Sequence, residues 1–110
     1  MGMALFTDAV PVTKGTSGIL ALSSKEVRDV SEGPCIRCGK CVDVCPLRLC
    51  PSIIANASQY EKWEDADKAG ALNCMACGTC AYVCPAGRYL VHRIKRAQNE
   101  IRAIKRAREA

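Results

Sequence analysis

Eight of the nine cysteines in this chain fall into two runs with the same spacing. Each run reads C-x-x-C-x-x-C-x-x-x-C-P. The first run is Cys35, Cys38, Cys41 and Cys45, and the second is Cys74, Cys77, Cys80 and Cys84. This is the ligand pattern of proteins that hold two [4Fe–4S] clusters. The sequence therefore predicts an electron carrier with two [4Fe–4S] clusters as its cofactors.

The fourth cysteine of each run is expected to bind the cluster of the other run. Three cysteines at steps of three residues can surround one cluster, whereas the fourth, four residues further on, has turned away from it. The predicted ligand sets are Cys35, Cys38, Cys41 and Cys84 for cluster 1, and Cys74, Cys77, Cys80 and Cys45 for cluster 2. We expect no catalytic residue and no cofactor-binding site besides the clusters.

The residues between the ligands repeat as well. The segments CIRCGKCVDVCP and CMACGTCAYVCP align residue for residue, which predicts two halves related by pseudo-twofold symmetry. Gly39 and Gly78 each follow the second cysteine of a run. A residue without a side chain permits unusual φ values there and lets backbone N–H groups approach cluster sulfur.

Other uses of cysteine fit the sequence less well. Structural zinc prefers pairs of C-x-x-C ligands separated by a longer loop, although a zinc-bound interaction module stays open as an alternative. A catalytic dithiol needs an isolated C-x-x-C near a βαβ pattern. A secreted disulfide scaffold would need a basic and apolar leader, and the chain starts MGMALFTD instead. We therefore expect a reducing, cytoplasmic setting.

Three residues outside the runs carry side chains that could also do chemistry. Cys50 could replace Cys45 as the crossing ligand, but it matches nothing in the second run and is interpreted as a buried thiol that binds no metal. His92 is the only histidine and is interpreted as a helix residue near the surface. Trp63 is interpreted as a packing residue of the segment between the runs.

The elements that position the runs are predicted to be helices. In the spacer at residues 46–73, Pro51 and Ser52 resemble a helix start, residues 61–69 are rich in helix formers, and Gly70 resembles a stop. The predicted fold class is mainly α, a helical two-[4Fe–4S] ferredoxin-like domain with a short β or irregular N-terminal arm.

A basic amphipathic helix is predicted over residues 90–108. Its apolar stripe consists of Ile94, Ala97, Ile101 and Ile104. Residues 88–110 carry eight basic and two acidic side chains, whereas residues 1–87 carry eight basic and nine acidic ones. We interpret the helix as packed on its own domain, and docking to a partner or a membrane surface is the alternative. No nucleic-acid recognition fold accompanies the charge, so we expect no nucleic-acid partner.

Residues 1–30 differ in composition from the rest of the chain. Within them, residues 16–23 are a short apolar run between turn residues, which predicts a strand. Because a lone strand is not stable, the arm is interpreted as the remnant of a preceding β-rich domain. The predicted organisation is this arm at 1–30, a helical bicluster ferredoxin domain at 31–92 and a C-terminal helix at 93–110. No segment reaches the apolar length of a membrane-spanning helix.

The segments CIRCGKCVDVCPLRL and CMACGTCAYVCP, with the helical spacer and the basic helix, resemble a known family. They are similar to the C-terminal two-cluster iron–sulfur part of the C subunit of the Rnf complex, the ion-translocating ferredoxin:NAD oxidoreductase. Residues 11–20, PVTKGTSGIL, also resemble the segment that leads into that part. Helical ferredoxin modules of succinate dehydrogenases and heterodisulfide reductases share the cysteine pattern, so the flanking segments make the resemblance specific.

The resemblance implies a relay of single electrons within a membrane-associated electron-transport complex. The implied partners are the other subunits, a flavoprotein or a ferredoxin among them. They would hold the chain at the cytoplasmic face of the inner or plasma membrane. In the family, a flavin and NAD(H) site lies in a large N-terminal region, whereas no Gly-rich nucleotide loop precedes the cysteines here.

We therefore expect an electron carrier on its own, and the resemblance implies a part of an NAD(H):ferredoxin oxidoreductase complex. Two alternatives keep the same clusters. One is the iron–sulfur piece of a flavin-dependent, cobalamin-type reductase, and the other is a stand-alone ferredoxin-like carrier.

Overall fold

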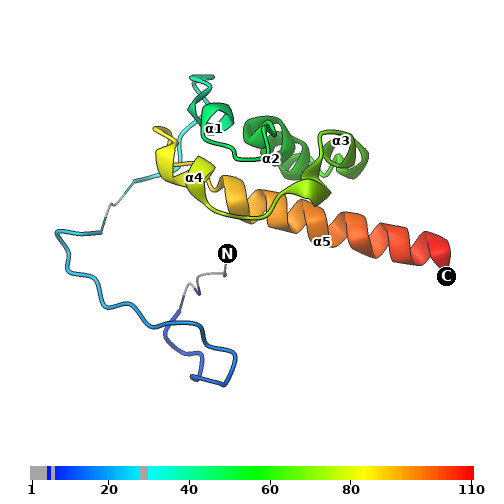
Figure 1. Ribbon diagram of the computed structural model, residues 1–110. Helices are drawn as coiled ribbons and strands as arrows, with labels where there is room; N and C mark the ends of the chain where they lie inside the picture. The colour runs from blue at the N-terminus through cyan, green and yellow to red at the C-terminus, as the bar shows by residue number, and fades with distance from the viewer. Residues whose placement is uncertain (1–4, 6, 28–29) are drawn as a thin grey trace.

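The computed structural model describes residues 5, 7–27 and 30–110, and every helix in these segments lies in the last of them. The helices are α1 Lys40–Asp43, α2 Pro51–Gln59, α3 Trp63–Lys68, the 3-10 helix η1 Ala71–Asn73, α4 Thr79–Val83 and α5 Leu90–Glu109 (Figure 1). No β-strand occurs among the described residues, so the prediction of a mainly α fold is confirmed. No helix there has both the length and the apolar character needed to cross a membrane.

The N-terminal arm differs from the prediction. Where a strand was expected at 16–23, the chain is irregular and runs apart from the helices (Figure 1). Ile19, Leu20 and Leu22 are 75%, 86% and 59% exposed. A strand needs a neighbour for its backbone hydrogen bonds, and the described residues supply none. The predicted strand at 16–23 is therefore not supported, whereas the irregular form of the arm, which we also predicted, is observed in the described residues.

The spacer between the cysteine runs is helical, as predicted. Pro51 is the first residue of α2, a position where the missing N–H of proline costs no hydrogen bond. After α3, Gly70 adopts a left-handed conformation with φ 85° and turns the chain into η1. A β-carbon at Gly70 would lie 3.1 Å from Leu49 Cδ2, so both the backbone and the packing favour glycine there.

Helix α5 lies along α2 and α3 and closes the main core (Figure 1). The buried members of this core are Ile54, Ala57, Ala66, Ala71, Ile94, Ala97 and Ile101. The apolar stripe predicted for the C-terminal helix is confirmed, because three of its members are buried here and Ile104 is half-buried. Alanines at the contacts allow the short helices to approach α5 closely.

Two buried polar side chains tie α5 to the rest of the domain. Ser58 Oγ donates a hydrogen bond of 2.7 Å to the Arg93 carbonyl. Gln98 Nε2 donates to two carbonyls, those of Ala71 and Cys74, at 2.8 Å each. Through the second of these bonds, α5 holds the residue that begins the second cysteine run.

The basic face of α5 meets acidic side chains of the preceding segments. The pairs are Arg93 with Glu32 at 2.7 Å, Arg96 with Glu61 at 2.8 Å, Lys105 with Asp67 at 2.8 Å and Arg108 with Glu64 at 3.5 Å. The Arg96 guanidinium also lies 5.5 Å from the ring centroid of Trp63, which packs half-buried against the core as predicted. The helix therefore packs on its own domain, in agreement with our interpretation.

Candidate metal centres

The internal repeat of the sequence is also a repeat of the backbone. Three pairs of residues at equivalent positions of the two runs have left-handed φ values. They are Arg37 and Ala76 at 56° and 55°, Gly39 and Gly78 at 77° and 85°, and Arg48 and Gly87 at 53° and 62°. Both halves thus follow the same path around their cysteines, which supports the predicted pseudo-symmetry.

Several of these left-handed residues are not glycine, so the local backbone is strained. Arg37, Arg48 and Ala76 each adopt a conformation that costs on the order of 1 kcal/mol or more for a residue with a side chain. Such residues persist only where the surroundings enforce them, and they cluster at functional sites. The turn at Ala76 directs its own N–H to Cys74 Sγ at 3.4 Å.

Two small pockets lie within the cysteine-rich half of the domain. The first is lined by Cys35, Cys38, Cys41 and Cys84, and the second by Cys45, Cys74, Cys77 and Cys80. Each pocket thus combines three cysteines of one run with the fourth cysteine of the other. The structure places all eight cysteines of the runs at these two pockets, four at each.

The pocket walls differ in polarity. The second pocket has apolar side chains besides its cysteines, among them Leu49, Ile54, Met75, Val91 and Ile94. The first pocket also has apolar walls, but Arg37, Ser52 and Arg88 line it as well. The two halves are therefore similar in backbone and unlike in charge.

The number and kind of donors at each pocket fit a [4Fe–4S] cluster. Within the described residues, no group of three or more His, Cys, Asp and Glu side chains is arranged to hold one metal ion. A [4Fe–4S] cluster takes one cysteine at each of four iron atoms, so its ligands surround a cavity and do not meet at one point. Four thiols around each pocket fit that requirement.

The thiols of the second pocket have different surroundings. Cys80 is buried, and burial is the main cause that raises the pKa of its thiol to about 11. Cys77 is exposed, and hydrogen bonding to Thr79, whose Oγ1 lies 3.4 Å from Cys77 Sγ, lowers the pKa of Cys77. Cys41 and Cys84 of the first pocket pack against the buried cluster that contains Cys80, so the two pockets are neighbours.

The remaining candidates line neither of the two pockets. Cys50 is half-buried just before α2, with its Sγ 3.8 Å from Ser52 Oγ, and it lines neither of the two pockets. His92 is exposed on α5 and makes an edge contact with Tyr89 at a centroid distance of 6.1 Å. His92 lies at the surface of a helix as we predicted, whereas Cys50 is less buried than we expected.

Sequence reasoning did not single out Arg88, which is 6% exposed and lines the first pocket. An alignment of the two runs distinguishes this residue. Arg88 stands four residues after the last cysteine of the second run, where the first run has Leu49.

Comparison with known proteins agrees with the geometry. The sequence model of the 4Fe-4S dicluster domain matches residues 25–85. The C subunit of the Na(+)-translocating ferredoxin:NAD(+) oxidoreductase complex of Acetobacterium woodii is 46% identical over 106 residues, which are 96% of this chain and 24% of that protein.

Two further C subunits match over similar lengths. That of the proton-translocating ferredoxin:NAD(+) oxidoreductase complex of Clostridium ljungdahlii is 41% identical over 94% of this chain and 23% of its own. That of the ion-translocating oxidoreductase complex of Methanosarcina acetivorans is 43% identical over 91% of this chain and 22% of its own. The chain thus spans about a quarter of the length of these curated relatives.

These matches confirm the resemblance to the Rnf C subunit and the prediction of two [4Fe–4S] clusters. The chain belongs to the family of 4Fe-4S dicluster domains.

Proposed function

We propose that this chain is the two-cluster electron relay of an Rnf-type complex. The observation that carries the proposal is the pair of neighbouring pockets, each lined by four cysteines drawn from both runs. Two [4Fe–4S] clusters supply one-electron chemistry when bound. The chain supplies their spacing, their burial and the hydrogen bonds around their ligands.

The ligand sets that we propose are crossed. Cys35, Cys38, Cys41 and Cys84 hold one cluster, and Cys74, Cys77, Cys80 and Cys45 hold the other. Four cysteine ligands leave no iron position for a substrate, so the proposed role is electron transfer and not chemistry on a bound molecule. Backbone N–H groups near the ligands support this role. The Leu49 N–H lies 3.4 Å from Cys45 Sγ, as the Ala76 N–H does from Cys74 Sγ.

The domain organisation remains part of the proposal. An arm at 1–30 leads to the bicluster domain at 31–92, and the C-terminal helix at 93–110 braces it. The contacts of α5 with α2 and the buried core between them support a bracing role for that helix.

Partners and location are inferred from the relatives. Since the similar proteins are subunits of ferredoxin:NAD(+) oxidoreductase complexes, the proposed partners are other subunits of such a complex, a flavoprotein or a ferredoxin among them. The proposed location is the cytoplasmic face of the membrane, through those subunits. The ion pairs on α5 leave Arg102 and Arg106 exposed as a basic surface for such contacts.

Anaerobic spectroscopy of the full chain tests the cofactor part of the proposal. We expect about eight iron and eight sulfide per chain and a brown colour that dithionite bleaches. The reduced chain is expected to give EPR signals of two interacting [4Fe–4S] clusters. A colourless chain that retains zinc, or one with a single cluster, would contradict the proposal.

A further inference from the structure

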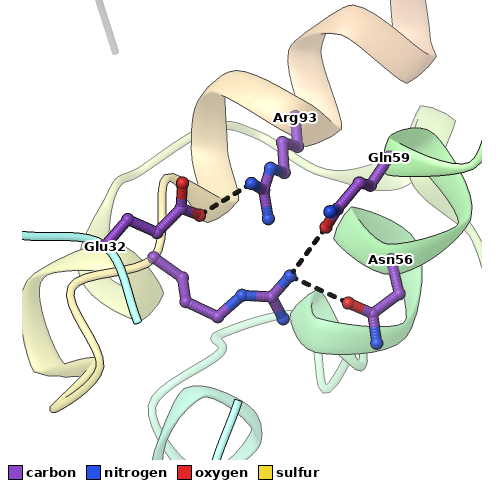
Figure 2. Close-up of polar contacts among 5 residues, drawn as sticks. Glu32, Asn56, Gln59 and Arg93 are labelled. Carbon is purple, nitrogen blue, oxygen red and sulfur yellow. Dashed lines mark hydrogen bonds and ion pairs between the residues drawn. The ribbon is translucent and has the colours of Figure 1, made fainter. Parts of the chain in front are cut away.

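Arg88 is a buried cation that forms no ion pair among the described residues. Its side chain follows the second cysteine run and is 6% exposed. Its Nη2 donates hydrogen bonds to Asn56 Oδ1 at 2.9 Å and to Gln59 Oε1 at 3.3 Å, the two dashed lines that end on α2 in Figure 2. Its Nη1 is buried and has no hydrogen-bond partner in the part of the chain that the structure describes. Buried guanidinium groups are normally paired with an anion.

The carboxylate that Figure 2 shows in this region is already engaged. Glu32 lies 2.7 Å from Arg93 Nη2, and this pair stands beside Asn56 and Gln59. Within residues 5, 7–27 and 30–110, every ion pair on a basic residue of the C-terminal region involves α5 and none involves Arg88. Arg88 therefore forms no ion pair within the described chain, and the carboxylate that lines the same open pocket, Glu32, is paired with Arg93.

The first cysteine pocket is the site that borders this charge. Arg88 lines that pocket together with Cys35, Cys38, Cys41 and Cys84. Arg88 and Cys35 also line the adjoining open pocket that contains Asn56 and Gln59. The arginine side chain thus forms part of the wall between the acceptors on α2 and the cysteines of the first set.

The second pocket lacks such a charge among the described residues. Its equivalent of Arg88 in the repeat is Leu49, which lines it with other apolar side chains. No described Lys, Arg, Asp or Glu lines the second pocket. Arg37 also lines the first pocket, but it is exposed, so solvent and salt screen it.

Hydrogen bonds to cysteine sulfur at the second pocket also stabilise negative charge there, as a nearby cation does, but more weakly. The N–H groups of Leu49 and Ala76 lie 3.4 Å from cysteine sulfur there. These donors are neutral dipoles at long distances, whereas a guanidinium carries a full charge that burial protects from screening. The effect of Arg88 on its own pocket is therefore expected to be the larger one.

From these observations we propose that Arg88 is the counter-charge of the cluster held by Cys35, Cys38, Cys41 and Cys84, and that it selectively raises the reduction potential of that cluster. The proposal rests on the crossed ligand sets proposed above. A [4Fe–4S] cluster with four thiolates is anionic, and reduction adds one more negative charge. A fixed cation nearby favours the reduced form, so Arg88 makes two clusters of similar backbone unequal as electron acceptors.

Potentiometric titration of the full chain with both clusters, followed by EPR, tests this role. Arg88→Gln removes the charge but keeps an amide that can bond to α2. We expect one reduction wave to move to lower potential by about 59 mV or more. For a one-electron step, this shift is a tenfold change in the equilibrium constant for reduction. The other wave should move less than half as far. Arg88→Lys should retain most of the wild-type potential, and Arg37→Gln, an exposed control at the same pocket, should shift it less.

The variant Cys77→Ser identifies the wave of the other cluster, because Cys77 lines only the second pocket of the two. If Arg88→Gln moves that wave, moves both waves equally or moves neither, the proposal is overturned. If Arg88→Gln does not load both clusters, Asn56→Asp replaces it, since that change places a carboxylate at the 2.9 Å contact with Arg88. The reduction wave of the cluster at the first pocket must then move to lower potential, and an unchanged potential would refute the role of Arg88. Iron and sulfide contents that exclude two clusters would instead refute the proposed function.

Discussion

Replacing Gln98 by methionine tests how α5 holds the second cysteine run. Gln98 is 6% exposed and donates to the carbonyls of Ala71 and Cys74. Methionine has a similar volume but no N–H donor, so the substitution removes both hydrogen bonds while it keeps the packing.

The cost can be worked out for each carbonyl. The Ala71 carbonyl keeps a second donor, the Cys74 N–H at 3.2 Å. Loss of the bond from Gln98 should therefore lower the free energy of unfolding by about 0.5–1.5 kcal/mol. Gln98 is the only donor to the Cys74 carbonyl among the described residues, and an acceptor left unpaired costs about 1–3 kcal/mol. The total is about 1.5–4.5 kcal/mol. At about 4 °C or more per kcal/mol for a domain of this size, Tm should fall by at least about 6 °C.

The assay is thermal unfolding of the cluster-loaded chain, followed by far-UV circular dichroism at one fixed heating rate. Asn99→Met is the matched control, because Asn99 is the next residue on α5 and is exposed. We expect little change in Tm for the control. If the two variants melt within about 2 °C of each other, the two buried hydrogen bonds do not contribute as reasoned.

Four further outcomes follow from the fold. Removal of iron with a chelator should abolish most of the helical circular dichroism, because ligand binding contributes folding free energy, and a cooperative melt of the iron-free chain would contradict this. Gly39→Ala and Gly78→Ala should each lower the free energy of unfolding by about 1–2 kcal/mol, because a β-carbon there meets nothing within 4 Å and only the left-handed backbone opposes it. Denaturation of the cluster-loaded chain measures this cost, and Gly18→Ala is the control because Gly18 has no left-handed φ. Ile54→Ala should cost about 2–5 kcal/mol in the same assay and Ile54→Val about 0.5–1.5 kcal/mol, because the side chain is fully buried. Arg96→Ala should cost less than about 2 kcal/mol, and less at high salt, because it removes a largely exposed ion pair with Glu61 and the contact with the Trp63 ring.

The sequence was most informative where chemistry constrains spacing. The cysteine runs predict which thiols gather, and the periodic stripe of residues 90–108 predicts the buried face of α5. The helix start at Pro51 and the stop at Gly70 could be predicted locally, because proline and glycine limit the backbone by themselves.

The sequence was least informative where contacts between distant segments, or an unusual backbone conformation, decide the structure. An apolar run such as residues 16–23 becomes a strand only beside a partner, and none is present among the described residues. The left-handed conformations of Arg37 and Ala76 could not be predicted from residues that rarely adopt them. The burial of Arg88 depends on α2, which is distant in sequence.

The crossed ligand sets are tested most directly by the pattern of cluster loss among serine variants of the ligands. We predict that Cys45→Ser damages the same EPR signal as Cys77→Ser, and that Cys84→Ser damages the same signal as Cys38→Ser. Cys50→Ser, which changes a cysteine outside both pockets, should leave both signals intact. If Cys45→Ser instead damages the same EPR signal as Cys38→Ser, each run holds its own cluster and the crossed arrangement is contradicted.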